Sequence, residues 1–483
     1  MRVNRVIFPG FQVGEQDPAE AERLVEAGVG GFCLYGGKAS EVAALTRRLQ
    51  ARSGGGLLFC ADYEDGAASH VRGATALPPN MALGASGDAA LSRLKGRVTA
   101  LEARALGVAW VLAPDVDLCV EPANPIVNVR SFGEDPVEVS RLASAYLEGL
   151  REGGALGCLK HFPGHGRTVG DSHLELPLVP AGPAALRRDL APYARLGPRA
   201  DAVMLAHLRV RGLDAGLPAS LSPRANGVLR RLGFRGLVVT DALDMRAISR
   251  RFDETEAARL ALLAGAHVLL VPKDPRALAR SLPRLVESDP RLRAAADRAL
   301  ARLESFAARV PARRPADWRR VVGCPAHRRA AERIARAAMV RLGPRAPAPR
   351  ALRYLEAEEG PARGRFFLDE LRRLGVRARP FRGPGPEPLA AAVFLRPRAY
   401  SGRIRLEGRA LARLRGALAR ERGAVLLSFG SPFVFDELPR WSVGLCAFTG
   451  IEAAQRAAAR VLAGRAPAPG RMPVRLNRLG RRP

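Results

Sequence analysis

The sequence predicts an α/β protein: an N-terminal (β/α)8 barrel of the TIM type, followed by a smaller C-terminal α/β sandwich domain. Three observations lead to this prediction. In the first three hundred residues, short unbroken apolar runs alternate with helix-like segments, which is typical of parallel strands buried on both faces. Polar residues recur directly after these runs, where the carboxyl ends of barrel strands would gather on one face. Finally, 483 residues exceed what a single hydrophobic core usually holds.

Eight apolar runs are candidates for the barrel strands. They are residues 6–8, 31–35, 57–60, 110–112, 156–159, 202–205, 237–239 and 268–271. The helical segments between them include residues 18–27, 41–52, 89–106, 136–152, 184–195 and 254–263. Eight βα units favour a closed barrel over the alternative, an open doubly wound sheet.

The rest of the chain divides into a linker and a second domain. We expect the barrel to occupy residues 1–307, and a linker that contains a helix to span residues 308–348, which are rich in Arg, Ala and Pro. Residues 349–483 again alternate strand candidates with helical segments, which predicts the small α/β sandwich. No GxGxxG motif follows a strand in this region, so nothing in it indicates a dinucleotide site.

The net charge of +30 could indicate a nucleic-acid ligand, but its composition argues against one. Of the 77 basic residues only four are lysines, and the arginines are scattered over the expected helices. A nucleic-acid site would instead concentrate them in one patch with interleaved aromatic residues. We therefore expect no specific nucleic-acid partner, and non-specific attraction to polyanions is the alternative.

The six cysteines indicate a reducing compartment. They are far apart, none forms a CxxC pair, and four lie in apolar runs, as expected of buried thiols. The N-terminal residues lack an apolar signal core, and no run of ~18 apolar residues predicts a membrane span. We expect a cytoplasmic protein that is a monomer or weak homodimer. We also expect it to need no metal or organic cofactor, because its histidines and cysteines lack ligand spacing.

The segment that begins at Lys160 concentrates scarce residue types. It contains Lys160, His161, His165, Asp171 and His173 within 14 residues, although the chain has only seven histidines. An apolar run leads directly into it, and loops at strand ends often carry catalytic groups. A catalytic loop is therefore favoured over a surface loop that contains histidines by chance.

Asp241 and the Asp171–His173 pair indicate the kind of chemistry. Asp241 follows an apolar run, where a carboxylate can act as a nucleophile; the alternative is an N-cap for the next helix. Asp171 lies two residues before His173, and a neighbouring carboxylate can orient an imidazole and tune its basicity. This combination suits retaining glycoside hydrolysis, with a histidine in the acid/base position that a second carboxylate usually takes.

Several segments resemble glycoside hydrolase family 3, and most closely its bacterial β-N-acetylglucosaminidases, including those of peptidoglycan recycling. KHFPGHGRTVGDSHLELP (160–177) is similar to the signature of that branch, and GFRGLVVTDALDM (233–245) to the family's nucleophile strand and turn. Further similar blocks are NPIVNVRSFGEDP (124–136) and PASLSP (218–223), with LLSFGSPFVFDELP (426–439) and PAPGRMPVRL (467–476) in the second domain.

The resemblance implies a retaining, exo-acting β-N-acetylhexosaminidase that forms a covalent glycosyl-enzyme intermediate. Its carbohydrate substrate would be a peptidoglycan fragment or a chito-oligosaccharide with terminal β-linked N-acetylglucosamine. The resemblance implies that Asp241 is the nucleophile, His173 the acid/base and Asp171 the residue that positions it. The sugar hydroxyls would be bound by Asp62, Arg130, Lys160 and His161. We expect the small apolar residues around Val203 and Met204 to accept the acetamido methyl group. For the charged members of this set, the alternative is a structural ion-pair network.

Two departures from the family pattern concern the loops around the sugar. Arg167 stands where the family usually has an acidic residue. The usual Glu-Gly-Gly-Arg-Val stretch is replaced by residues 64–72, so its arginine is missing or displaced to Arg72. Both changes put the aglycone preference in doubt.

Three other functions remain as alternatives. A β-glucosidase or β-xylosidase of the same family would typically lack the Asp-Ser-His sequence that is present here. A phosphorylase would use phosphate in place of water, which a histidine acid/base would not repel. A non-catalytic barrel that binds sugars or polyanions would not need Asp241, Asp171 and His173.

Overall fold

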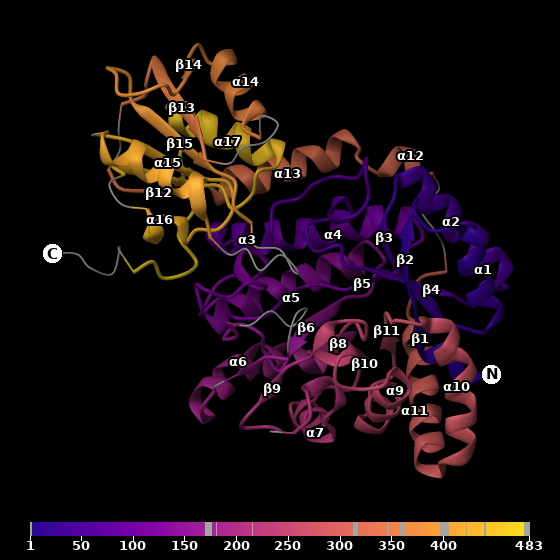
Figure 1. Cartoon of the computed structure of the whole chain (residues 1–483). Helices are drawn as coiled ribbons and strands as arrows, with labels where there is room; N and C mark the ends of the chain where they lie inside the picture. The colour runs from indigo at the N-terminus through magenta and orange to yellow at the C-terminus, as the bar shows by residue number, and fades with distance from the viewer. Residues whose placement is uncertain are drawn as a thin grey trace.

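The computed structural model comprises a parallel-stranded barrel and a second α/β unit beside it (Figure 1). It describes residues 2–169, 176–179, 181–214, 216–312, 317–344, 347–357, 363–396, 405–421, 423–438 and 441–477. Within this part of the chain, no helix combines the length and the apolar character that crossing a membrane requires.

Eight strand positions within the described residues form the closed parallel barrel that the sequence predicts. They are β1 (Ile7–Phe8) with its continuation β2 (Gly10–Val13), β3 (Gly31–Gly36), β4 (Leu58–Ala61), β5 (Trp110–Val111), β6 (Cys158–Phe162), β8 (Ala202–Leu205), β10 (Leu237–Thr240) and β11 (Leu269–Leu270). Parallel ladders join β2–β3–β4–β5, β6–β8–β10 and β1–β11. Single bridges complete the ring: Trp110 pairs with Leu156 between β5 and β6, and Val239 with Val268 between β10 and β11.

Helices cover the outside of the barrel and alternate with its strands. They are α1 (Pro18–Glu26), α2 (Ala39–Arg52), α3 (Asn80–Ser86), α4 (Ala89–Ala105), α5 (Pro136–Glu152), α6 (Pro183–Leu196), α7 (Pro223–Arg231), α8 (Arg246–Ser249), α9 (Glu254–Ala264), α10 (Pro275–Ser288) and α11 (Pro290–Ala307). Aspartate caps begin several of them: Asp135 accepts a hydrogen bond from the Val137 amide at α5, and Asp253 accepts one from the Thr255 amide at α9. Outside the ring, β7 (Leu178–Val179) and β9 (Arg209–Val210) form a small parallel pair.

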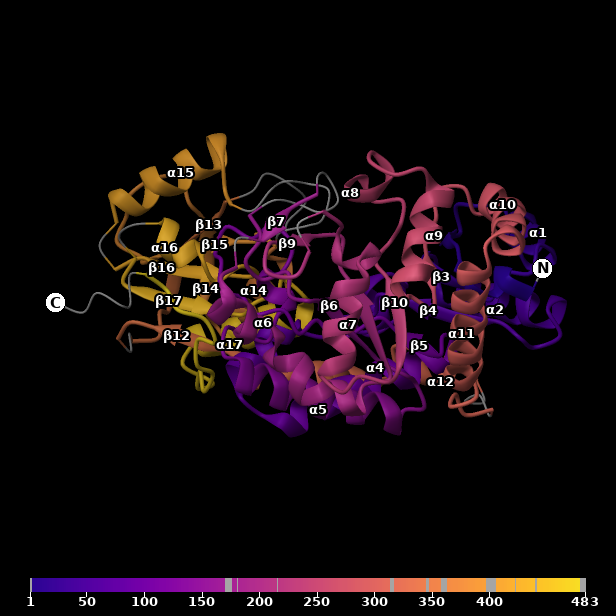
Figure 2. The same ribbon diagram turned by 90° about the horizontal axis from the view of Figure 1, so that it is seen from below.

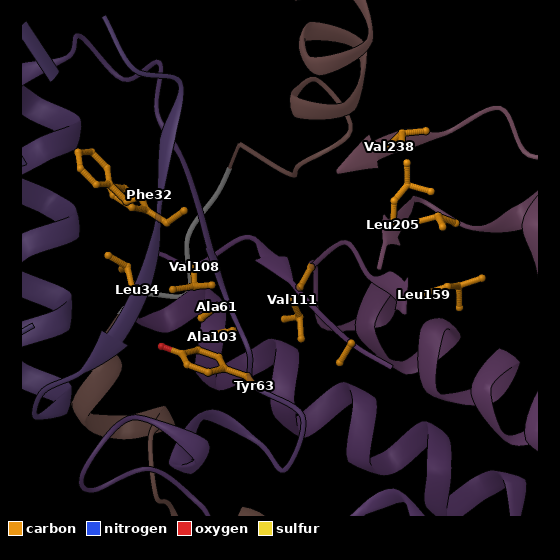
Figure 3. Packing of buried hydrophobic residues seen from close by; sticks show 14 of the residues in the cluster. Phe32, Leu34, Ala61, Tyr63, Ala103, Val108, Val111, Leu159, Leu205 and Val238 are labelled. Atoms are coloured by element: carbon orange, nitrogen blue, oxygen red, sulfur yellow. The ribbon is translucent and has the colours of Figure 1, made fainter. Parts of the chain in front are cut away.

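Neighbouring residues of each strand belong to different apolar layers because strand side chains alternate between faces. Met204 on β8 lies in the cluster that fills the barrel interior, whereas Val203 and Leu205 pack in the layer between strands and helices. Figure 3 shows part of this outer layer, including Phe32, Leu159 and Leu205. The alternation decides which residue at each strand end faces the barrel axis.

The second unit is a three-layer α/β sandwich, which confirms the predicted fold class. Its sheet has the order β12 (Val340–Leu342), β17 (Val443–Cys446), β16 (Val425–Ser428), β15 (Leu389–Val393), β13 (Ala351–Glu356), β14 (Arg377–Pro380). β12 is antiparallel to β17, and the other pairs are parallel. α14 (Arg365–Arg373) and α17 (Glu452–Leu462) pack on one face, whereas α15 (Gly408–Ala419) and α16 (Val434–Glu437) pack on the other.

The two units meet along one side of the barrel. In Figure 1 the second unit lies near α3 and α5, and in Figures 1 and 2 α10 and α11 lie on the opposite side of the barrel. α12 (Trp318–Val321) and α13 (Pro325–Ala338) connect them, and buried Glu102 on α4 accepts hydrogen bonds from the Gly323 amide and His327 Nδ1 in this connection. β12 lies within the residues assigned to the linker but pairs with the second sheet. The domain boundaries remain a prediction.

Candidate active site

A cavity of about 1290 Å³ opens at the carboxyl ends of the barrel strands. The residues predicted to bind or attack the sugar line it: Asp62, Arg130, Lys160, His161, Met204 and Asp241. The predicted acid/base His173 and its partner Asp171 lie outside the described residues. The barrel thus brings the described candidates to the face where enzymes of this fold carry their active sites.

Lys160 is the centre of a charged network in this cavity. Its Nζ lies 2.6 Å from Asp62 Oδ1 and 2.6 Å from Glu64 Oε1. Arg130 binds the same Glu64 in a two-pronged ion pair, with Nε 2.9 Å from Oε2 and Nη2 2.8 Å from Oε1. The Lys160 side chain is 2% exposed and that of Asp62 is 29% exposed, so Asp62 is the member most open to the cavity.

Opposite charges keep this network ionised. Burial alone would lower the pKa of Lys160, but the carboxylates of Asp62 and Glu64 outweigh burial and raise it. Burial would likewise raise the pKa of Glu64, but Arg130 and Lys160 hold it well below its usual range. At neutral pH the network therefore offers N–H donors from Lys160 and Arg130 and a carboxylate acceptor from Asp62.

Buried neighbours fix the ring of His161. Nδ1 lies 2.7 Å from Asp117 Oδ2, and Nε2 lies 3.3 Å from Arg130 Nη2. Burial, followed by the positive charge of Arg130, lowers the pKa of His161 to about 4, so the ring is neutral at pH 7. The tautomer that suits both neighbours has Nδ1–H donating to Asp117 and Nε2 accepting from Arg130.

Asp115 and Asp117 form a buried carboxyl pair behind His161. Asp117 Oδ1 accepts the backbone N–H of His165 at 2.7 Å. Burial raises the pKa of Asp117 to about 6. Burial, together with the neighbouring Asp117, raises the pKa of Asp115 to about 8. Asp115 Oδ2 has no hydrogen-bond partner among the described residues, and Arg130 Nε lies 3.7 Å from it.

The carboxyl pair and His161 together have the ligand types of a metal site. Asp115, Asp117 and His161 each place one ligand atom within 4.8 Å of the others. However, the Arg130 guanidinium already lies against Asp115, and a cation there would face this positive charge. The expectation that no metal is needed remains a prediction.

Two paired strands place Met204 and Asp241. β8 and β10 pair in register, so Met204 lies beside Val239, and Asp241 follows the end of β10. The Asp241 amide donates to the Leu205 carbonyl and its Oδ1 accepts from the Ala242 amide, both at 2.9 Å. α8 begins at Arg246 with Met245 as its N-cap, so the alternative that Asp241 caps the next helix is wrong.

His207 supports the turn that contains Asp241. It follows β8, is buried, and its Nε2 donates to the Ala242 carbonyl at 2.9 Å. Its Nδ1 lies 2.7 Å from the hydroxyl of Ser220, which belongs to the PASLSP segment. This segment therefore takes part in holding the turn after β10.

Comparison with known proteins identifies the family. Residues 7–306 match the Glycosyl hydrolase family 3 N terminal domain. The chain belongs to glycosyl hydrolase family 3. The predicted family and the predicted class, a glycoside hydrolase, are thereby confirmed.

Relatives of this family 3 chain include two proteins named β-hexosaminidases and one enzyme of solved structure. A β-hexosaminidase of Chromobacterium violaceum is 35% identical over 335 residues, which cover 66% of this chain and 90% of that protein. A β-hexosaminidase of Mycobacterium tuberculosis is 36% identical over 292 residues, which cover 53% of this chain and 70% of that protein. A family 3 β-N-acetylglucosaminidase from Paenibacillus sp. str. FPU-7 is 28% identical, with a TM-score of 0.84 and 98% of both chains covered.

The two arginines that mark the departures from the family 3 pattern, Arg167 and Arg72, lie outside the cavity lining. Arg167 Nε binds Asp189 Oδ2 on α6 at 2.8 Å. Arg72 Nη2 lies 3.9 Å from Glu41 on α2, and the Arg72 side chain is 70% exposed. Arg72 therefore does not bring the usual arginine of the 64–72 loop into the cavity; Glu64 and His70 from this loop line it instead.

The cavity also contains residues that the sequence did not assign to the site. Glu64 binds both cations, His165 lines the wall, and the second unit contributes Arg396, Thr449 and Ile451. Glu64 had a usable signal, because it follows a predicted strand together with Asp62. The residues of the second unit had none, because their position depends on how the two units pack.

Proposed function

We propose that this family 3 protein is a retaining, exo-acting β-N-acetylhexosaminidase that removes terminal β-linked N-acetylglucosamine. The observation that carries the proposal is the convergence of Asp62, Arg130, Lys160, His161 and Asp241 on one cavity. The names of the two β-hexosaminidase relatives and of the Paenibacillus enzyme support this choice of activity.

The charged network binds the hydroxyl groups of the terminal sugar. Asp62 accepts hydrogen bonds from hydroxyls, while Lys160 and Arg130 donate to their oxygens. His161 is neutral at pH 7 and is held in place by Asp117, so it adds a polar contact without a further charge. Because each charged group already has a buried partner, the donors and acceptors are oriented before the sugar arrives.

Asp241 and His173 divide the chemistry between two steps. In the first, the Asp241 carboxylate bonds to the anomeric carbon while the glycosidic C–O bond breaks and His173 gives its proton to the leaving oxygen. In the second, His173 takes a proton from water, the water oxygen bonds to the anomeric carbon, and Asp241 leaves. Asp171 orients the imidazole. Two inversions give overall retention, and no redox partner is required.

Met204 is assigned to the acetamido group. Its side chain is 2% exposed, belongs to the barrel interior cluster and lines the cavity. A flexible thioether on strand β8 beside the Asp241 turn suits contact with a methyl group next to the reacting carbon. A glucoside lacks this group and would leave the contact unmade.

The test compares two aryl glycosides that share one leaving group. We expect the β-N-acetylglucosaminide to be hydrolysed with a much higher kcat/KM than the β-glucoside, and NMR of the first-formed sugar to show the β-anomer. The assay is run with and without inorganic phosphate. Release of a sugar 1-phosphate would show that the reaction is phosphorolysis and not hydrolysis. A preference for the glucoside or an α-anomer would reject the proposal.

Three properties of the protein in the cell belong to the same proposal. Peptidoglycan fragments are the proposed natural substrate, although the pocket chemistry suits chito-oligosaccharides equally. The described cysteines are free and five of the six are buried, which supports a reducing, cytoplasmic location. A monomer or weak homodimer is the proposed state, which light scattering at micromolar and millimolar-range concentrations would test.

A further inference from the structure

The second unit contacts the barrel on both sides of the Glu64–Arg130 ion pair. On one side, the Asn128 amide Nδ2 donates to Ser431 Oγ at 3.1 Å, two residues before Arg130. On the other side, Arg396 Nη2 lies 2.6 Å from Asp65 Oδ2, one residue after Glu64. Thus the two turns that supply this ion pair are each tied to a loop of the second unit.

The contact at Asn128 sits on a strained and buried turn. Asn128 is 3% exposed and has a φ of 34°, which lies on the left-handed side that residues other than glycine seldom adopt. Its neighbours Val127 and Val129 are buried in the same apolar cluster as Val393 and Phe448 of the second unit. Surroundings that over-determine a backbone are what keep such a conformation populated.

The contact at Asp65 involves Arg396, a partly exposed cation at the cavity wall. Asp65 is 13% exposed and lies 3.4 Å from the fully buried Lys95 Nζ as well as 2.6 Å from Arg396. Arg396 lines the same cavity as Arg130 and its side chain is 39% exposed. Removal of Arg396 would leave Asp65 with the longer of its two ion pairs.

We propose that Arg396 and Ser431 are positioning residues for sugar binding, supplied by the second domain. They fix the turns that present Glu64 and Arg130 to Lys160, and they thereby set the affinity for the terminal sugar. The inference rests on the proposed function in one respect: the sugar is taken to be bound by this network. Neither residue takes part in bond making or breaking, so the effect should fall on binding more than on turnover.

The experiment compares Arg396→Ala, Ser431→Ala and the conservative Arg396→Lys in the full-length protein. Arg475→Ala is the matched control, because Arg475 also forms an ion pair between the units, 3.1 Å from Glu134, but does not line the cavity. For each alanine variant at the site we expect KM to rise about threefold to thirtyfold while kcat stays within about twofold. Arg396→Lys should recover much of the loss, and the control should resemble the wild type.

Hydrogen–deuterium exchange of the peptide around residues 126–132 gives a readout that does not require turnover. We expect faster amide exchange there in Ser431→Ala, whereas Arg396→Ala should speed exchange in the peptide that contains Glu64 and Asp65. Neither peptide should change in Arg475→Ala. If the wild type does not hydrolyse the glycoside, the proposed function fails, and exchange still decides the positioning role. Unchanged exchange and KM in folded site variants would overturn the inference. Equal effects in the control would overturn it too, because they would reflect the interface as a whole.

Discussion

Asp115→Asn tests whether the buried carboxyl pair holds a proton at neutral pH. Asp115 is fully buried, and burial together with Asp117 raises its pKa to about 8. In the unfolded chain an aspartate has a pKa of about 3.9. Between these values the native protein binds a proton that the unfolded chain has lost, so the wild type loses stability as the pH rises toward 8.

The size of the effect follows from the one bound proton. Proton linkage gives a slope of about 1.4 kcal/mol per pH unit within that window, or roughly 2–3 kcal/mol between pH 5 and pH 7. Asparagine has the shape of the protonated carboxyl and does not titrate. The free energy of unfolding of Asp115→Asn minus that of the wild type should therefore rise with this slope and level off above pH 8.

Urea unfolding followed by tryptophan fluorescence measures this difference at pH 5, 6, 7 and 8, since Trp110 is buried in the barrel interior. Asp214→Asn is the control. There, hydrogen bonds led by that of Ser222 outweigh burial and lower the pKa, so its stability contribution is complete above pH 5. A pH-independent difference for Asp115→Asn, or one that falls as the pH rises, would refute the reasoning.

Four further outcomes are expected. Asp241→Asn should lose several orders of magnitude in kcat with an unchanged circular dichroism spectrum, and near-normal activity in a clean preparation would reject it as the nucleophile. His173→Ala should slow substrates with poor leaving groups far more than activated aryl glycosides, with azide rescue of the second step; equal losses on both would contradict its acid role. Glu64→Gln should raise KM by about tenfold or more, because Lys160 and Arg130 lose a shared buried carboxylate; an unchanged KM would show that the pair is only structural. Chelation with EDTA should leave activity unchanged, whereas a loss restored by a divalent ion would place a metal at the site.

The barrel could be predicted because its strands are buried on both faces and therefore appear as unbroken apolar runs. The apolar runs do not show which further residues pair with a distant strand. β2 was absent from the prediction because Pro9, which has no N–H, separates it from β1. The antiparallel β12 was assigned to the linker because three residues with one partner, β17, give no periodic signal of their own.

The site was predictable where one residue type at a strand end determines the chemistry. Asp62 follows β4, Asp241 follows β10, and Lys160 lies within β6; all three reach the cavity as expected. Asp117 and Glu64 also follow strands, but their roles depend on partners: Asp117 orients His161, and Glu64 joins two cations. Such roles depend on contacts between segments that are far apart in the chain, and a single sequence does not give these contacts. The positions of Asp171 and His173 lie outside the described residues, so their roles remain predictions.

The environment of Arg167 shows why a cation in the proposed catalytic loop need not change the charge of the site. Arg167 Nε binds Asp189 on α6 at 2.8 Å, and Asp189 is only 5% exposed, so the new cation is matched by a buried carboxylate. Burial raises the pKa of Asp189 above its ordinary value, and the positive charge of Arg167 opposes this shift. The ion pair with Arg167 therefore stabilises the charged form of Asp189. The contact ties Arg167 to α6, and neither Arg167 nor Asp189 is among the residues that line the cavity. The loop thus has a firm attachment on its N-terminal side, and the glycines at 164 and 166 lie within the anchored part. We therefore expect Arg167 to act through the anchoring of the loop and to leave the electrostatic environment of Asp241 unchanged.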